Sequence, residues 1–226
     1  MASIMNSETQ VNIITGYHLD QFQIGMFEYI NHDHLTFLTV HDFKNLCDRN
    51  ELRINYVRRH EHKGGSIEIG IVRSDSAASE EESVGQILQR EVWMRHDSND
   101  LIYTMLANIE RNRNVIRELL STFYSKGYCI SGIGASISST ALLYSFDIGK
   151  YFDSLYDDDP RKIGKFSPGF GIQVLDLAET NLDMNTINVI LSWQHTDRLL
   201  SRLREVGRFG LVIIPMPSAR LIFLDA

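Results

Sequence analysis

The chain has 226 residues, of which 43% are hydrophobic and 23% are charged, and its formal net charge is −7. This is the composition of a globular chain, long enough for one large domain or two small ones. The acidic balance argues against a general nucleic-acid binder, which carries a basic excess. No apolar run reaches the length that crosses a membrane.

The cysteines and the N-terminus indicate a cytoplasmic protein. Cys47 and Cys129 are far apart and form no Cys-x-x-Cys pair, which favours a reduced, intracellular location. The first residues lack the basic and apolar regions of a signal peptide. His60 and His62 flank Glu61 in a charged turn, but no third ligand stands nearby, so we expect no metal and no zinc.

The first half of the chain mixes short strands with helices. Apolar periodicity predicts strands over 11–14, 27–30, 52–58 and 66–72, a weak helix over 17–27 and a capped helix over 39–50. The last two strands would form the antiparallel ending of an α/β sheet. Small side chains and acidic residues over 73–83 indicate a linker. We expect helices over 84–95 and 99–126 after it.

His32, Asp33 and His34 follow the predicted strand over 27–30. The end of a strand is where α/β proteins place ligands and catalytic groups. A carboxylate can orient a histidine as a general base, since imidazole titrates near neutral pH. The alternative is a polar turn with solvated histidines.

A strand, a glycine-rich turn and a helix that can open at Thr140 follow one another over 128–144. Gly132, Gly134, Ala135 and Ser136 form the turn. This arrangement can aim backbone amides at an anion, usually a phosphate, although it lacks the third glycine of the dinucleotide fingerprint. The alternative is a tight turn with no ligand.

The rest of the chain continues the α/β pattern. We expect strands over 152–156, 171–174, 186–191 and, as the last strand, 209–214, with a helix over 197–206. This order predicts a small, mostly parallel α/β domain from about residue 125 to 226. Three aspartates at 157–159 follow the second of its strands, where ribose hydroxyls are held in Rossmann-like units, or they form a solvated turn.

Four segments of this half together resemble one family. They are Gly132-Ile-Gly-Ala-Ser136, Asp159-Pro-Arg-Lys-Ile-Gly-Lys-Phe-Ser-Pro-Gly169, Leu191-Ser-Trp193 and Ile214-Pro-Met-Pro217. In order and spacing they resemble the C-terminal domain of S-adenosylmethionine-dependent sugar C-methyltransferases, which methylate a carbon of a nucleotide-linked deoxysugar. Upstream, 31–37 resembles the family's Tyr-His-Glu-His-Leu-Ser-Tyr, and 62–67 resembles its His-Gly-Gly-Ser-Leu with one residue inserted.

The resemblance implies an α/β fold with three regions. Residues 1–75 would be a remnant of the C-terminal part of a methyltransferase-like domain, and 76–126 a linker with helices. Residues 127–226 would form the Rossmann-like C-terminal domain, a mostly parallel sheet flanked by helices.

The resemblance also implies roles for single residues. His34 matches the catalytic histidine, the base on the sugar carbon next to a keto group. Asp33 replaces a glutamate and Asn31 replaces a tyrosine, which removes an aromatic hydroxyl. The residues expected to bind substrate are His32, Gly132, Gly134, Ala135, Ser136, Asp159, Lys162 and Lys165.

Departures from the family leave several functions open. No zinc-binding cysteine domain and no methyl-donor loop precede residue 12, so we expect S-adenosylmethionine not to be bound by this chain alone. The first interpretation is a truncated C-methyltransferase whose partner chain brings the donor to a nucleotide-linked sugar. The others are a nucleotide-sugar-binding protein or epimerase-like enzyme, and a catalytically inactive interaction module. A homo-oligomer is compatible with each, and no nucleic acid or membrane partner is expected.

Overall fold

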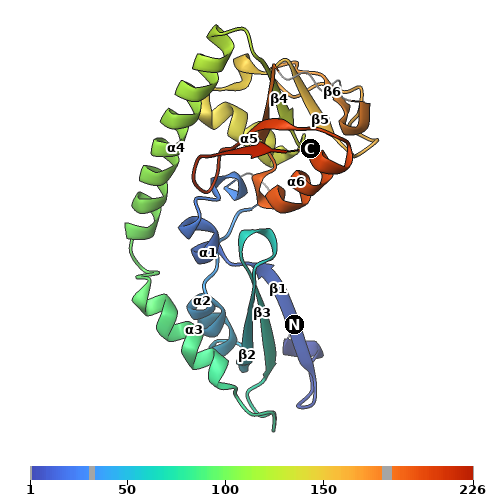
Figure 1. Ribbon diagram of the computed structural model, residues 1–226. Coiled ribbons are helices and arrows are strands. Elements are labelled where there is room, and N and C mark those ends of the chain that lie inside the picture. The colour runs from blue at the N-terminus through green and yellow to red at the C-terminus, as the bar shows by residue number, and fades with distance from the viewer. Residues whose placement is uncertain (1, 31–33, 180–184, 226) are drawn as a thin grey trace. The chain divides into compact units, whose positions relative to one another are not determined.

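The structure, a computed structural model, describes residues 2–30, 34–179 and 185–225 (Figure 1). The chain divides into two compact units, Met1–Leu106 and Ala107–Ala226. The boundary falls inside the long helix α4, Asp100–Ser125. Within the described residues, no helix is both long and apolar enough to cross a membrane.

The first unit, Met1–Leu106, is built on an antiparallel sheet of three strands in the order β1-β3-β2. The strands are β1 (Gln10–Gly16), β2 (Leu52–His60) and β3 (Ser66–Arg73). Side chains alternate between the faces of a strand, so Ile67, Ile69 and Ile71 of β3 share one face. All three are buried, and they form the centre of the unit's core.

Helices α2 (Val40–Asp48) and α3 (Glu82–Trp93) lie on one side of this sheet (Figure 1). Both contact β2, and buried Val40, Cys47 and Ile87 join the core of β3. The short helix α1 (His18–Gln23) follows β1, and single turns of 3-10 helix occupy Ala2–Ile4 and His62–Gly64. The predicted strands over 11–14, 52–58 and 66–72 and the predicted helix over 39–50 are confirmed.

The strand predicted over 27–30 is wrong, because Phe27–Tyr29 form a turn of 3-10 helix. Gly25, at φ 75°, turns the chain just before it. The Phe27 amide donates to the Gly25 carbonyl at 2.9 Å, and the Ile30 amide donates to the Phe27 carbonyl at 2.9 Å. These local bonds take the place of a strand partner. The antiparallel pairing of β2 with β3 is confirmed, with β1 as the third strand.

The second unit, Ala107–Ala226, contains a six-stranded sheet in the order β6-β5-β4-β7-β8-β9. The strands are β4 (Cys129–Ile133), β5 (Ser154–Asp157), β6 (Val174–Asp176), β7 (Thr186–Ile190), β8 (Gly210–Ile214) and β9 (Arg220–Leu224). All neighbours are parallel except β8 and β9. The predicted Rossmann-like, mostly parallel sheet is therefore confirmed.

The strand order places the helices of this unit on both faces of the sheet. The connection from β4 to β5 through α5 (Ile137–Phe146) runs toward the β6 edge of the sheet. The connection from β7 to β8 through α6 (Thr196–Glu205) runs toward the β9 edge. Right-handed crossovers then put α5 and α6 on opposite faces, as Figure 1 shows. The order reverses between β4 and β7, and this point positions the site described below.

Helix α5 and strand β6 begin at residues other than the predicted ones. Helix α5 begins at Ile137, ahead of the predicted Thr140, because Ser136 and Ser139 form a capping box. The strand predicted over 171–174 begins only at Val174, since Gly171 adopts φ 64°.

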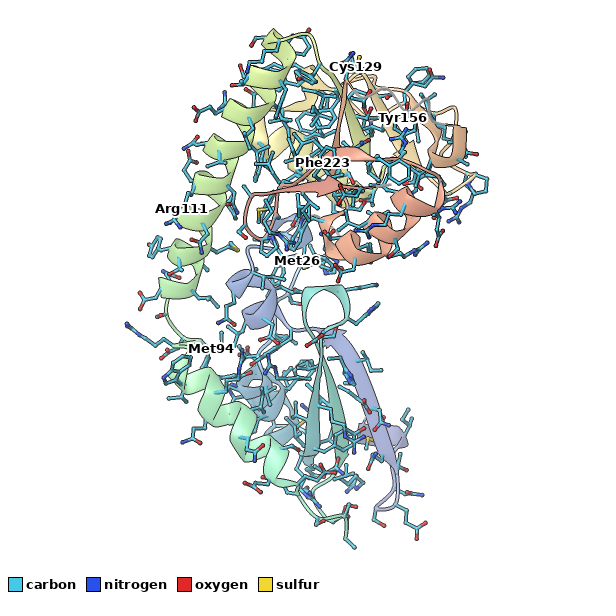
Figure 2. The ribbon with its side chains drawn as sticks, in the orientation of Figure 1. Met26, Met94, Arg111, Cys129, Tyr156 and Phe223 are labelled. Atoms are coloured by element: carbon cyan, nitrogen blue, oxygen red, sulfur yellow. The ribbon has the colours of Figure 1, made fainter. Side chains whose placement is uncertain are left out.

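Residues 209–214 are not the last strand, because β9 follows as an antiparallel edge strand that was not predicted. Its Phe223 is 61% exposed and is labelled in Figure 2. Strand β9 follows β8 after a turn that is held to α4, where the Asn112 side-chain amide donates to the Pro217 carbonyl at 2.7 Å.

Candidate functional site

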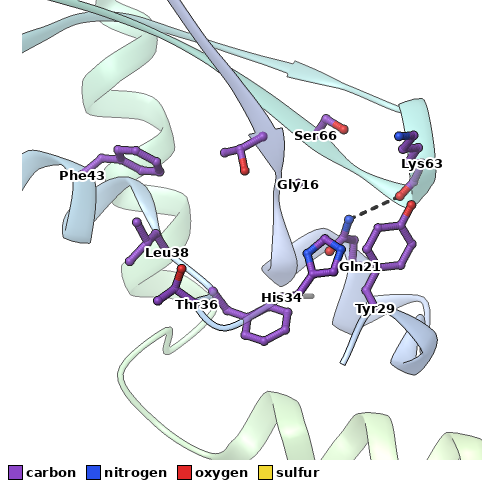
Figure 3. Close-up of a pocket in the computed structure, with 11 residues that line it drawn as sticks. Gly16, Gln21, Tyr29, His34, Thr36, Leu38, Phe43, Lys63 and Ser66 are labelled. Atoms are coloured by element: carbon purple, nitrogen blue, oxygen red, sulfur yellow. Dashed lines mark hydrogen bonds between the residues drawn. The ribbon is translucent and has the colours of Figure 1, made fainter. Parts of the chain in front are cut away.

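The first candidate site is a cavity of about 200 Å³ within the first unit (Figure 3). It brings together segments that are far apart in sequence: the end of β1, helix α1, the turn at Tyr29, the segment 34–38 and the start of β3. Its lining residues are Thr15, Gly16, Gln21, Tyr29, His34, Thr36, Phe37, Leu38, Phe43, Lys63 and Ser66. Two of the motifs that carry the family resemblance, around His34 and around Lys63, therefore meet at one cavity.

His34 is exposed, and its ring lies beside that of Tyr29, with the ring centroids 5.3 Å apart. Figure 3 shows the two rings next to the Gln21 side chain, whose amide donates to the Lys63 and Gly65 carbonyls at 3.3 and 3.2 Å. Among the described residues, neither ring nitrogen of His34 has a hydrogen-bond partner. His34 lines the cavity, and a neutral imidazole there can accept a proton from a bound molecule.

Tyr29 is half-buried, and burial, followed by the nearby charge of Glu28, raises the pKa of its hydroxyl above the ordinary value. The phenol is therefore protonated at neutral pH and can donate a hydrogen bond to an oxygen that gains negative charge. Sequence reasoning missed Tyr29 because it assigned the residue to a strand. Its position three residues before the His32–His34 cluster was the available signal.

The buried carboxylate of Glu91, on α3, anchors the chain that follows His34. It accepts hydrogen bonds from the Val40 amide at 2.7 Å, the His41 amide at 3.0 Å and the Tyr17 hydroxyl at 3.0 Å. His41 Nδ1 also lies 2.6 Å from it. Negative charge at a helix N-terminus is favourable, so Glu91 fixes the start of α2 and with it the end of the segment 34–38.

Three of the predicted site residues, Asn31, His32 and Asp33, lie outside the described residues. The orientation of His34 by Asp33 stays a prediction. What the structure does describe is the far end of the same segment, where Phe37 packs edge-on to His18 and tilted against Phe22, with centroids 6.1 and 5.8 Å away.

The second candidate site is a cavity of about 220 Å³ in the second unit, at the carboxyl ends of β4, β5 and β7. This is the point where the strand order reverses, and ligands of doubly wound sheets bind there. Its polar lining consists of Ser136, Tyr156, Asp157, Asp158, Lys162, Ser192, His195 and Arg198. Three of the four resembling segments of this half contribute residues to it.

The amides of the glycine loop already have partners. The Gly134 amide donates to the Tyr156 carbonyl at 2.7 Å, and the Ala135 amide donates to Asp157 Oδ2 at 2.7 Å. Lys162 Nζ lies 2.9 Å from the same carboxylate oxygen. The anion that this loop holds is therefore the carboxylate of Asp157. Both amides are therefore used within the chain.

Two further predicted residues, Ala135 and Lys165, line a neighbouring cavity of about 170 Å³. Lys162 lines both this cavity and the second candidate site. Gly132 and Asp159 are not among the described lining residues of either cavity.

Gly132 is needed for packing, since a Cβ there would meet the Leu155 and Leu191 side chains. Asp159 accepts two hydrogen bonds from the Arg161 guanidinium, at 3.0 and 2.8 Å. These bonds lower the pKa of the Asp159 carboxyl to about 2. The described residues contain no group of three or more His, Cys, Asp or Glu side chains that could hold a metal ion.

Comparison with known proteins relates the chain to C-methyltransferases. Residues 61–217, more than half of the chain, match the C-methyltransferase C-terminal domain. The chain is also similar to the C-methyltransferase NovU of Streptomyces niveus, with 26% identity over 215 residues. That match covers 93% of this chain but only 50% of NovU, so the chain spans about half the length of this relative. The chain belongs to the family of C-methyltransferase C-terminal domains.

Proposed function

We propose that this chain binds a nucleotide-linked keto-sugar and removes the proton that C-methylation requires, while a partner polypeptide brings S-adenosylmethionine. The observation that carries the proposal is the cavity of the first unit, where the motifs around His34 and Lys63 meet beside Tyr29. Membership of a C-methyltransferase family supports the reaction class.

The proposed step is proton removal from a carbon next to a carbonyl. A ring nitrogen of His34 takes the proton, and the electron pair of the C–H bond moves into a carbon–carbon double bond. The carbonyl oxygen gains the negative charge, and the protonated Tyr29 hydroxyl donates a hydrogen bond to it. The product is an enolate whose carbon is nucleophilic, as C-methylation requires.

The cavity of the second unit suits the binding part of the proposal. Lys162 and Arg198 pair with Asp157 and Asp158 at 2.9 and 3.3 Å, but each cation has further N–H donors. Ser136 and Ser192 supply hydroxyls. Charged and hydroxyl donors of this kind match phosphate oxygens and sugar hydroxyls. The Ser136 and Ser192 oxygens lie 3.3 Å apart, so they form one polar surface.

The test measures deuterium exchange at the sugar carbon next to the carbonyl. A panel of nucleotide-linked keto-sugars is incubated with the protein in D₂O, and NMR monitors the exchange. His34→Ala should slow exchange by about 100-fold or more, because it removes the general base. Calorimetry should show sugar binding unchanged. His60→Ala is the control, since His60 pairs with Glu68 on the hairpin and lies outside the cavity.

Two results would count against the proposal. Exchange at the wild-type rate in His34→Ala would remove His34 as the base. A wild-type chain that binds the keto-sugar but exchanges no proton would instead support a nucleotide-sugar-binding protein without this chemistry.

A further inference from the structure

Arg208 is a buried cation of the second unit, between α6 and β8, and is only 3% exposed. Its backbone amide donates to the Leu203 carbonyl at 2.8 Å, and its Nη1 donates to the Asn188 side-chain oxygen at 2.9 Å. Burial lowers the pKa of the guanidinium, but arginine is basic enough to stay charged at neutral pH. A charge inside a protein is costly unless its contacts compensate for it, so these contacts indicate what the residue is for.

The guanidinium of Arg208 lies over the ring of Tyr156. Its central carbon is 3.9 Å from the ring centre, a distance at which the face of an aromatic ring attracts a cation. Tyr156, labelled in Figure 2, belongs to β5 and packs against the core cluster that contains Leu200 and Leu203 of α6. Because Arg208 is itself held by Leu203 and Asn188, its contact fixes the position of the tyrosine ring.

Tyr156 also borders the second candidate site, whereas Arg208 is not among the described residues that line it. The guanidinium covers one face of the ring, so the other face and the edge remain for the cavity. Leu177 and Leu199 line the cavity too, and both pack with Tyr156 in the same core cluster. The cavity therefore has an apolar wall built around this ring, and its other side chains are polar.

We propose that Tyr156 stacks on the base of the nucleotide-linked sugar, and that Arg208 is the residue that positions Tyr156 for this contact. The inference rests on the proposed function, which assigns the nucleotide-linked sugar to this chain. An aromatic side chain stacks on any base, because every base has a π face. A ring that is already fixed loses little freedom when the ligand binds, which favours affinity. The phosphates then face the polar side chains, which include Lys162 and Arg198.

The test compares a ligand that has a base with one that has none. A panel of nucleoside diphosphates carrying each of the common bases is screened by calorimetry, and the tightest binder is compared with inorganic pyrophosphate. Tyr156→Leu should raise the dissociation constant of the nucleoside diphosphate by about tenfold, since one base stack is lost. Arg208→Met should raise it by about threefold, because the ring stays but is no longer held. Neither change should alter the affinity for pyrophosphate.

A double variant shows whether Arg208 acts through Tyr156. In the Tyr156→Leu background, Arg208→Met should cause no further loss of affinity. Asn188→Ala removes the hydrogen bond that holds the guanidinium, so it should repeat the selective loss, and it replaces Arg208→Met if that variant does not fold. Tyr151→Leu is the matched control, because Tyr151 lies 5.4 Å from the Lys150 ammonium and is not among the described residues that line either cavity of this unit. It should leave both affinities unchanged, and thermal unfolding verifies that each variant folds.

Three outcomes would overturn the inference. Tyr156→Leu could weaken both ligands equally or neither, which would exclude a contact with the base. The losses in the double variant could add, which would separate Arg208 from Tyr156. The wild-type chain could bind pyrophosphate as tightly as every nucleoside diphosphate, which would exclude a base site. None of these measurements follows proton exchange, so the chemistry of the proposed function fails separately, through His34→Ala.

Discussion

Tyr29 provides a phenol close to the position where the family pattern has one. The resemblance places an aromatic hydroxyl at Asn31, which has none. Tyr29 stands two residues earlier, and its ring lies beside His34 because the 3-10 turn directs it into the cavity. Burial raises the pKa of its hydroxyl, so at neutral pH the hydroxyl is protonated and can donate a hydrogen bond.

Tyr29→Phe should therefore slow deuterium exchange at the sugar carbon by about 100-fold, the usual loss when one oxyanion donor is removed. The phenylalanine ring keeps the contact with His34, so sugar affinity measured by calorimetry should not change. Tyr103→Phe is the control, because Tyr103 is 65% exposed on α4 and lines no cavity described here. An unchanged exchange rate in Tyr29→Phe would exclude the hydroxyl from the reaction.

The start of helix α2 shows how a single element is held in place. The Thr39 hydroxyl accepts from the Asp42 amide at 3.1 Å, and the Asp42 carboxylate accepts from the Thr39 amide at 2.8 Å and its hydroxyl at 2.7 Å. Partial burial raises the pKa of the Asp42 carboxyl, but these hydrogen bonds outweigh burial and leave the pKa below its ordinary value.

This lowered pKa makes the contribution of the capping box depend on pH. A carboxyl whose pKa is lowered by folding stabilises the fold above its unfolded pKa, near 4, and loses this contribution as pH falls through the folded pKa. At pH 7, Asp42→Asn should reduce the free energy of unfolding by about 1 kcal/mol. The difference from wild type should shrink as the pH falls below about 4, as measured by urea unfolding across pH.

Asp48→Asn on the same helix is the control. Asp48 pairs with Lys44 at 2.7 Å, but both side chains are about half exposed, so the change should cost no more than about 0.5 kcal/mol. A gap between Asp42→Asn and wild type that stays constant as the pH falls below about 4 would show that the carboxylate charge is not the cause.

At the scale of the whole molecule, the proposal gives the two units different tasks. The proton acceptor His34 belongs to the first unit, and the cationic Lys162 belongs to the second. A residue that only binds should affect substrate affinity, and a residue that only transfers a proton should affect the rate of the bound complex.

Lys162→Met should accordingly raise the dissociation constant of the nucleotide-sugar by about tenfold, through loss of one charge-assisted hydrogen bond. The exchange rate at saturating sugar should stay at the wild-type value. Lys150→Met, which removes an exposed lysine paired with Asp147, should change neither quantity. Equal losses of affinity and rate in Lys162→Met would contradict the division of tasks.

Much of the fold could be predicted because its elements carry clear periodic patterns. The isoleucines of β3 alternate strictly, and α2 has both a cap and an apolar stripe. The predictions failed where local hydrogen bonds decided the structure, as in the 3-10 turn at 27–29. Strand β9 was missed although Leu221–Leu224 is an apolar run, and it pairs antiparallel with β8.

The candidate sites were harder to predict, because they depend on contacts between distant segments. Sequence spacing identified Gly134 as part of an anion-binding turn. In the structure its φ of 95° and its close approach to Ser192 explain the glycine, and Asp157 uses the neighbouring amide. The meeting of His34 with Lys63 follows from the pairing of Gly16 with Ser66, which no local pattern encodes.

The buried carboxylate of Glu91 also bears on how this sequence can diverge. One side chain serves Tyr17, the backbone of α2 and His41, so a change at 91 leaves several buried donors unsatisfied at once. Loss of Tyr17 or His41 alone leaves the carboxylate with its two backbone partners. We therefore expect homologues to vary at 17 and 41 while keeping an acid at 91, and any lineage that loses the acid to change all three positions together.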